Sequence, residues 1–465
     1  MSADERLEEV CETLEDPDVE LRRKISTILT IPRIFTVQEL TTERCEKLFT
    51  SAPVEVFDCV LNSEDRQFQD GKPLIAHILS FCCQMTSPTT HMKFKPVIAN
   101  IVKLSTPKNG PLTTSTLNDI TIIVTYMSDD RKCIYDFLRN TTSYFINQGE
   151  KLEVEVFLSI SKLLLSKIFS LINVGDDAST IDTRVWPVGI LSIIRNLIKE
   201  KTEKMSETII IGIWDIIGSV SRLMGPDWFS LDENFAKIVA QMNTVEINMA
   251  LHTADSIDVV KFARHLRILE VFVSAINDEE IFTEGGTLND VCLAVGSGVR
   301  YILLFWIEAT NTSIKLADEV LLNLFTFTIF LLSRGELEIA DEKQREQIDK
   351  LILTESLRIV DDYENIQDVS RLYEELFEKM DDLKVLDERV PLIAVKFLGR
   401  MREVQRRDAW KIVCIETTVA LMELRGRKDW YNKTSIKESL KLLENFNEDD
   451  QHDISSLRKL FEKLS

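Results

Sequence analysis

Hydrophobic residues along this chain recur mostly three or four positions apart, the spacing that places them on one face of an α-helix. Residues 1–31 follow this spacing and predict two acidic helices, the second ending at Pro32. Thr36 and Glu39 have the spacing of a capping box and predict the start of the next helix. The same pattern predicts further helices over residues 71–85, 96–103, 117–127, 129–147, 150–172, 187–199, 209–224, 235–251, 257–276, 289–309 and 313–332.

One of these segments, 117–127, is rich in Ile, Val and Thr and by local propensity alone could form a strand. We predict a helix there, because its neighbours are helical and a lone strand has nothing to pair with. Turn residues predict loops at 106–111 and 174–177.

The hydrophobic pattern weakens after Arg334 and recovers near the end of the chain. Residues 336–389 are dense in acidic residues, which predicts solvated helices on an outer surface, with a disordered tail as the alternative. A strong apolar stripe returns over 391–424, and 435–464 alternates charge with leucine as a terminal capping pair would. We therefore divide the chain into N-terminal and central repeats, 1–335, and C-terminal repeats with a cap, 336–465.

The central stretch 208–273 is the clearest helix, corner, helix, helix unit, and Gly225-Pro226-Asp227-Trp228 forms its corner. Glycine permits a tight helix exit and the following proline blocks continuation of the helix. Asp227 is expected to accept hydrogen bonds from nearby backbone N–H groups, and Trp228 to pack across neighbouring helix pairs. Ser230 begins a capping-box pattern for the next helix. We interpret this motif as a structural corner with no ligand role.

The predicted elements amount to roughly twenty helices, or roughly ten pairs of about 45 residues each, the length of armadillo and HEAT units. One such pair cannot bury its own apolar face, and stacking completes the core. No sequence consensus repeats visibly. The prediction is an all-α fold, a right-handed α-solenoid of armadillo/HEAT-like helical repeats.

Composition agrees with long helices in a folded chain. Of 465 residues, 45% are hydrophobic and 28% charged, and only 15 are glycine and 11 proline. The net charge of −21 would repel a nucleic-acid backbone, so we expect no nucleic-acid partner. We read the acidity as solubility, with attraction to basic segments of partner proteins as the alternative.

The cysteines and the apolar runs indicate a cytoplasmic protein. None of the eight cysteines forms a CxxC pair, so we expect reduced core thiols. Residues 1–16 lack the apolar region of a signal peptide. The longest apolar runs, 209–224 and 320–332, are too short for a membrane span, so none is predicted.

No recognisable catalytic or ligand-binding motif occurs. None of the five histidines has zinc-site spacing; His77 is predicted to be a core histidine, and His265 to lie on a polar helix face. Gly296-Ser297-Gly298 lacks the third glycine of a dinucleotide fingerprint, and no phosphate-binding loop or nucleophile elbow is present. We predict no enzyme activity, no cofactor and no metal.

A basic cluster interrupts the acidic C-terminal part, at the turn between two late helices. Its members are Arg400, Arg402, Arg406, Arg407 and Lys411. The favoured interpretation is structural: the side chains lie over apolar surface or pair with the acidic residues of 364–382. The alternative is a docking patch for an acidic or phosphorylated segment of a partner protein.

The central motif resembles the neurochondrin family. Gly225-Pro226-Asp227-Trp228, then Phe235-Ala236 and Val245-Glu246-Ile247 to Ala250-Leu251, are similar to that family's glycine-to-tryptophan corner and the segments after it. The chain departs from the family at the helix start, where Asn234 replaces a lysine. The similarity covers 74–332, and an N-terminal cysteine pair found in some relatives has no counterpart.

The resemblance implies a cytosolic, non-enzymatic helical-repeat scaffold for signalling proteins, associated with neurite outgrowth and located in the cytoplasm and neuronal processes. It further implies protein partners, namely cytoplasmic tails of receptors or a calmodulin-dependent kinase. The alternative is an importin- or HEAT-type cargo or assembly adaptor that binds basic peptide segments, although the six tryptophans show no regular spacing. Neither function assigns an oligomeric state.

Overall fold

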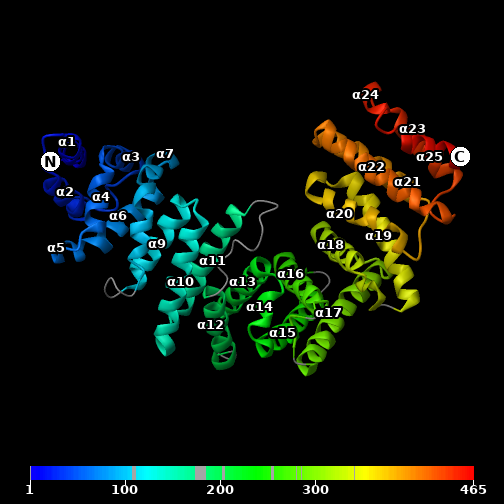
Figure 1. The fold of residues 1–465 in the computed structure, drawn as a ribbon, viewed down its shortest axis with the longest axis horizontal. Helices are drawn as coiled ribbons and strands as arrows, with labels where there is room; N and C mark the ends of the chain where they lie inside the picture. Colours follow the sequence, from blue (N-terminus) through cyan, green and yellow to red (C-terminus); the bar gives the residue numbers. More distant parts are fainter. Residues whose placement is uncertain are drawn as a thin grey trace. The chain divides into compact units, whose positions relative to one another are not determined.

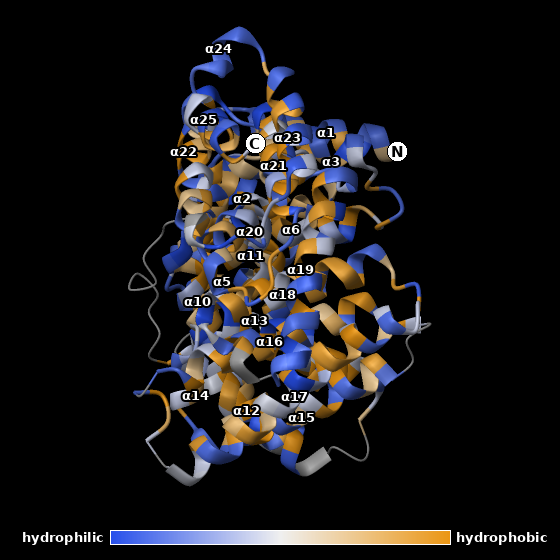
Figure 2. Ribbon diagram, turned by 90° about the vertical axis from the view of Figure 1, so that its right-hand side faces the viewer, coloured by the Kyte–Doolittle hydropathy of each residue, from blue (hydrophilic) through white to orange (hydrophobic). Residues whose placement is uncertain are grey.

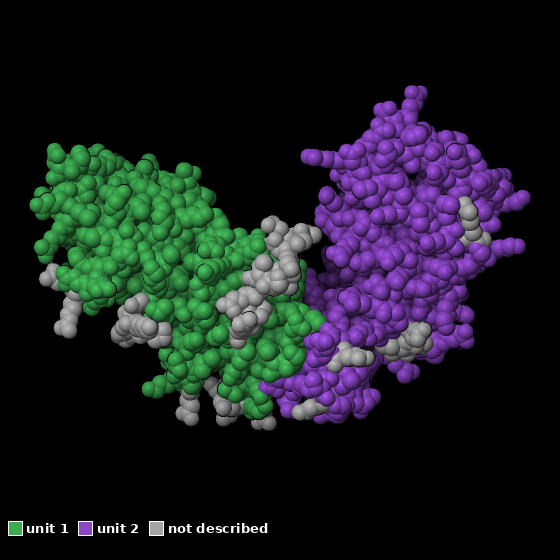
Figure 3. All heavy atoms as spheres, in the orientation of Figure 1, with its two compact units in different colours: residues 1–231 green, residues 232–465 purple. Residues whose placement is uncertain are grey.

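The computed structural model describes residues 2–106, 112–172, 185–201, 205–252, 256–278, 280–283, 285–339 and 341–465. Over these residues the regular structure is entirely helical. They fall into two compact units, 1–231 and 232–465 (Figure 3).

Unit 1 contains fourteen α-helices among its described residues, several of them single turns. Most of them are labelled in Figure 1. They are α1 (Ala3–Glu15), α2 (Leu21–Ile34), α3 (Thr42–Ser51), α4 (Val54–Asn62), α5 (Arg66–Gln69), α6 (Gly71–Met85), α7 (Pro88–His91), α8 (Ile98–Lys103), α9 (Thr114–Met127), α10 (Arg131–Gln148), α11 (Val154–Leu171), α12 (Trp186–Lys201), α13 (Glu207–Met224) and α14 (Asp227–Ser230). In one layer α1, α3, α6, α9, α11 and α13 each pack against the next, and α2, α4, α8, α10 and α12 do the same in a second layer.

Unit 2 repeats this two-layer arrangement. Its helices are α15 (Glu233–His252), α16 (Val259–Ile276), α17 (Gly285–Asn311), α18 (Asp318–Arg334), α19 (Glu342–Asp362), α20 (Ile366–Glu378), α21 (Val390–Val404), α22 (Arg407–Glu423), α23 (Lys433–Glu444), α24 (Glu448–Gln451) and α25 (Ser455–Leu464). The odd-numbered helices from α15 to α25 form one layer, and α16, α18, α20 and α22 form the other. The apolar faces of the two layers meet and make the core.

Polar contacts between successive helix pairs reveal the length of the repeat. In unit 1 the Asn100 amide donates to the Asp58 carboxylate, 42 residues earlier, at 3.0 Å. In unit 2 Arg358 donates to Asp318, 40 residues earlier, at 2.9 Å. Each pair thus lies against the pair roughly one repeat before it, which confirms the predicted all-helical, tandem stacking of helix pairs.

The local predictions hold for most helices. The ambiguous segment 117–127 lies within α9, a helix as predicted. The acidic segment after Arg334 forms α19 and α20, and the compositional boundary at residue 335 lies inside unit 2, where α18 packs against α19. Of the predicted loops, residues 107–111 and 174–177 lie outside the described part of the chain.

Two predicted helix boundaries near the N-terminus were wrong. α2 continues through Pro32 to Ile34, because a proline so near the end removes only one helical hydrogen bond. The Thr36–Glu39 pair closes a turn instead of starting a helix. The Glu39 carboxylate accepts from the Thr36 backbone N–H (2.9 Å) and hydroxyl (3.0 Å), whereas α3 begins at Thr42.

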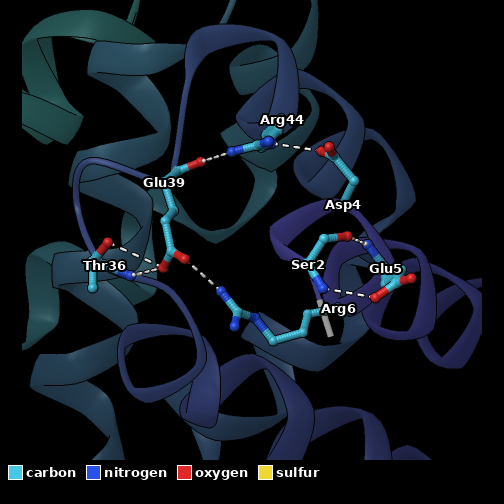
Figure 4. Close-up of polar contacts among 7 residues, drawn as sticks. All are labelled: Ser2, Asp4, Glu5, Arg6, Thr36, Glu39 and Arg44. Carbon is cyan, nitrogen blue, oxygen red and sulfur yellow. Dashed lines mark hydrogen bonds and ion pairs between the residues drawn. The ribbon is translucent and has the colours of Figure 1, made fainter.

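Glu39 instead belongs to a polar cluster that joins α1 to the turn before α3 (Figure 4). Arg6 of α1 donates to the Glu39 carboxylate at 2.6 Å, and Arg44 of α3 donates to both Asp4 and the Glu39 carbonyl, each at 2.8 Å. Hydrogen bonds from Thr36 and then from Arg6 lower the pKa of Glu39. The turn is held by these contacts and not by a helix.

Two histidines lie in the opposite environments to those predicted. The His77 side chain is 61% exposed and lies 3.2 Å from the Asp119 carboxylate. His265 is fully buried between α15 and α16, where its Nδ1 lies 2.7 Å from the Asn243 amide oxygen. Burial, and then the charges of Arg264 and Lys261, lower the pKa of His265 to about 3.

Candidate functional site

The Gly225–Trp228 motif is a corner in which Trp228 is the buried residue. α13 ends at Met224, and Gly225 follows with φ +63° and ψ −155°, a conformation open essentially only to glycine. Trp228, within the single-turn helix α14, is fully buried, and its indole N–H donates to the Pro187 carbonyl of α12 at 3.3 Å. The predicted packing of Trp228 against a neighbouring repeat is therefore confirmed.

Two details of the predicted corner were wrong. The Asp227 side chain is exposed and accepts no backbone hydrogen bond within the described residues; its carbonyl accepts from the Ser230 hydroxyl at 2.8 Å. Ser230 lies inside α14, and α15 is capped by Asp232, whose carboxylate accepts from the Phe235 N–H at 3.0 Å. Because Pro226 starts the short helix α14, the residue that caps α15 is Asp232 and not Ser230.

The predicted basic cluster lies at the turn between α21 and α22, and most of its charges are engaged within the chain. Arg402 donates to the Asp450 carboxylate at 2.8 Å and lies over the Trp410 ring, 5.4 Å from its centroid. Arg407 and Lys411 lie 3.2 Å and 3.1 Å from the Asp453 carboxylate. The cluster thus holds α24 and the turn after it against α21 and α22.

The partners differ from those predicted. Only Arg400 reaches toward the acidic segment 364–382, and it donates to backbone carbonyls, chiefly those of Val360 (3.0 Å) and Tyr363 (2.7 Å) at the end of α19. Arg406 precedes α22 and is exposed. A cavity of about 470 Å³ next to Arg400 and Arg402 is bounded by α19, α21 and the 442–450 segment. Binding of an acidic partner at this cluster stays a prediction.

Electrostatics at Asp453 fit a structural role for the cluster. Burial pushes the pKa of this carboxyl up, but hydrogen bonds and charge from Lys411 and Arg407 outweigh it and lower the pKa overall. Asp453 therefore stays ionised, and its single negative charge is shared between the two cations.

A different surface, on α22, has the character of a binding site. A surface helix normally carries polar residues on its solvent face. The solvent face of α22 instead carries an apolar stripe of four residues at helical spacing: Ile412, Ile415, Val419 and Met422. Ile415 is 57% and Val419 50% exposed, although α22 also buries a full apolar face with Trp410 and Val413. Figure 2 shows hydrophobic and hydrophilic residues mixed along the helices.

The neighbouring helix α20 turns a polar, acidic face to solvent. Glu374 and Glu378, one turn apart on α20, and Glu416 and Glu423 on α22 line a hollow of about 490 Å³. Apolar side chains, including Phe377 and Ala420, form its floor. We call this surface, with the α22 stripe, the α20/α22 groove. Within the described residues no ion pair involves any of its four carboxylates; the nearby Arg371 pairs with Glu375 at 3.3 Å.

Like charges act on one another across the groove. Partial burial, and then the charge of Glu416, raise the pKa of Glu374, while Arg371 opposes this only in part. A cation entering the groove would relieve this repulsion. The sequence signal for the groove was present, since apolar residues of α22 occur on both faces. Only the buried face was recognised, because the partner helix α20 could not be placed from the sequence.

No alternative chemistry emerges from the described residues. None of their His, Cys, Asp and Glu side chains form a group suited to a metal ion. Burial raises the pKa of Cys82 to about 12, the opposite of what a nucleophilic thiolate requires. Gly296, Ser297 and Gly298 lie within α17, where Gly298 allows close approach of Thr244.

One helix in the described part of the chain, α17, is long and apolar enough to cross a membrane by length and composition alone. In unit 2 it packs against α15, α16 and α19.

Comparisons with known proteins leave the chain without a family assignment. No protein-family model matches it, and no curated protein matches it. A circular tandem repeat protein with a novel repeat topology is 12% identical, with 99% of this chain and 94% of that chain covered and a TM-score of 0.19. The N-terminal domain of Rif1 from Saccharomyces cerevisiae is 10% identical, with 98% and 64% covered and a TM-score of 0.24. TM-scores this low add nothing to the fold described above.

Proposed function

We propose that this chain is a non-enzymatic helical-repeat scaffold that binds other proteins. The observation that carries the proposal is the α20/α22 groove, where an apolar stripe lies exposed beside four carboxylates that form no ion pair with any described residue. Exposed apolar surface rimmed by polar residues is typical of protein-interaction sites. Tandem helix pairs supply a long surface of this kind without any catalytic group.

The finer assignment rests on the sequence. We propose a right-handed solenoid of armadillo/HEAT-like repeats, related to the neurochondrin family and acting in the cytoplasm and neuronal processes. Its partners would then be cytoplasmic tails of receptors or a calmodulin-dependent kinase. The support for this resemblance is the corner itself: Gly225 adopts a conformation open essentially only to glycine, and Trp228 is buried against α12.

The proposal is tested by affinity capture from neuronal extract with the purified full chain as bait. Recovery of a kinase or a receptor tail, confirmed with the isolated partner, is the expected result. Kinase activity measured with and without the chain then tests whether binding restrains it. Failure to recover either class of partner would remove the neurochondrin-like assignment.

The acidity of the groove specifically favours a second candidate, an adaptor for basic peptide segments of the importin or HEAT type. Against it, all six tryptophans are buried, so no row of exposed indoles lines a surface. Binding of an extended basic peptide that persists at high salt would favour this adaptor over the signalling scaffold, since simple charge attraction is screened by salt.

A further inference from the structure

The α20/α22 groove has a defined length and pattern. Its apolar stripe follows the spacing i, i+3, i+7 and i+10 from Ile412 to Met422, so it runs about 15 Å along one face of α22. This length corresponds to about three turns of a helix laid alongside. An apolar face of a second helix, with the same spacing, would cover the stripe.

The charges of the groove restrict what covers it. Carboxylates stand on both sides of the apolar floor, at Glu374 and Glu378 on α20 and at Glu416 and Glu423 on α22. An occupant with lysine or arginine flanking its apolar face would neutralise them. A second copy of this surface would bring carboxylate against carboxylate, and an anionic membrane would be repelled for the same reason.

We propose that the α20/α22 groove binds a basic amphipathic helical segment of a partner protein. The inference rests on the proposed scaffold function and specifies the chemistry of its partner. The apolar stripe would supply the buried contact area, and the four carboxylates would select cationic flanks and reject acidic ones.

The test uses the purified full chain and synthetic helical peptides of about 18 residues, or about five turns. The first peptide places leucine on one helical face and lysine elsewhere. The second has the same composition in an order that forms no apolar face, and the third keeps the leucine pattern with glutamate in place of lysine. Binding is followed by fluorescence anisotropy at physiological ionic strength, where distant charges are screened.

Two pairs of variants separate the groove from the general acidity of the chain. Glu374→Lys with Glu378→Lys reverses charge in the groove, and Glu9→Lys with Glu12→Lys makes the same change on the exposed face of α1. Ile415→Ser with Val419→Ser removes the stripe. Its control changes two equally exposed apolar residues of α15, Val245 (55%) and Met249 (52%), to serine. Circular dichroism confirms that each variant is folded.

We expect the first peptide to bind at least about tenfold more tightly than the other two, and each groove variant to weaken it at least about tenfold. The control variants should change its affinity less than about twofold. Equal binding of the first two peptides, or equal weakening by groove and control variants, would overturn the inference. The inference would also be overturned if the chain dimerised, or adsorbed to phosphatidylserine vesicles, and the Ile415→Ser, Val419→Ser variant lost that property. If the captured partner binds the groove variants normally, the groove inference fails while the scaffold function stands.

Discussion

Replacing Trp228 with alanine should destabilise unit 1 by about 3–5 kcal/mol, the range observed for large buried aromatic residues. The structure places the value in the upper half of that range. Trp228 is fully buried, its ring lies 5.6 Å from that of Phe229, and its indole N–H donates to the Pro187 carbonyl of α12. The substitution therefore removes packing between repeats and a hydrogen bond worth about 1 kcal/mol.

The loss is measured by urea unfolding followed by far-ultraviolet circular dichroism, with hydrogen exchange to locate it. Exchange should accelerate first in α12, whose Pro187 carbonyl accepts the Trp228 hydrogen bond, and in α13, which ends at this corner. Trp228→Phe keeps most of the ring and should cost only about 1–2 kcal/mol. The matched control is Leu231→Ala at the half-exposed neighbouring position, which should cost less than about 1 kcal/mol. An unchanged unfolding midpoint and unchanged exchange in Trp228→Ala would refute the packing role of the corner.

Three further perturbations test the account of the fold. Gly225→Ala should destabilise the protein by about 1–3 kcal/mol, because alanine is strained in the backbone conformation of Gly225. Gly296→Ala lies mid-helix with open space around it and should stabilise the protein by about 0.5–1 kcal/mol. Equal effects of the two substitutions in urea unfolding would contradict this reasoning. His265 is held neutral when folded but takes up a proton when unfolded below pH 6.5, so stability should fall as the pH drops from 6.5 toward 3. One unit below 6.5 the loss should be about 1.4 kcal/mol relative to pH values well above 6.5. His265→Gln should flatten that dependence, and an unchanged slope would show that other groups cause it. Asp349→Ala leaves the buried Arg345 guanidinium without its 2.9 Å partner and should cost about 3–5 kcal/mol in the same unfolding assay, where a loss below about 1 kcal/mol would argue against a buried pair.

Most helices could be predicted from apolar periodicity and turn residues, because both depend only on residues close together in the sequence. The helical neighbours of α9 decided its prediction against a strand-like composition, and Gly225 with Pro226 located the end of α13. Periodicity could not place the histidines. His265 follows an arginine and was assigned to a polar face, but the helix twist directs it into the core, where Asn243 of another helix satisfies it. The burial of His265 depends on a neighbouring helix, and the residues around His265 in the sequence do not indicate which helix that is.

The candidate site was harder to predict for the same reason. The basic cluster at Arg402 and Arg407 was visible as a run of charge, yet its partners, Asp450 and Asp453, lie more than forty residues later. The α20/α22 groove forms only because Glu374 of α20 lies close to Ile415 of α22. Tandem stacking brings such residues together, and a sequence without a visible repeat consensus does not give that register.

The central claim is that the chain binds partner proteins through the α20/α22 groove. It is tested most directly by placing a photo-crosslinking amino acid at Val419 in cells, with Met249 as the equally exposed control site. The account predicts a crosslink from Val419, and not from Met249, to a partner segment that alternates lysine or arginine with apolar residues at helical spacing. Crosslinks from Val419 only to other copies of the chain, or to no protein at all, would contradict it.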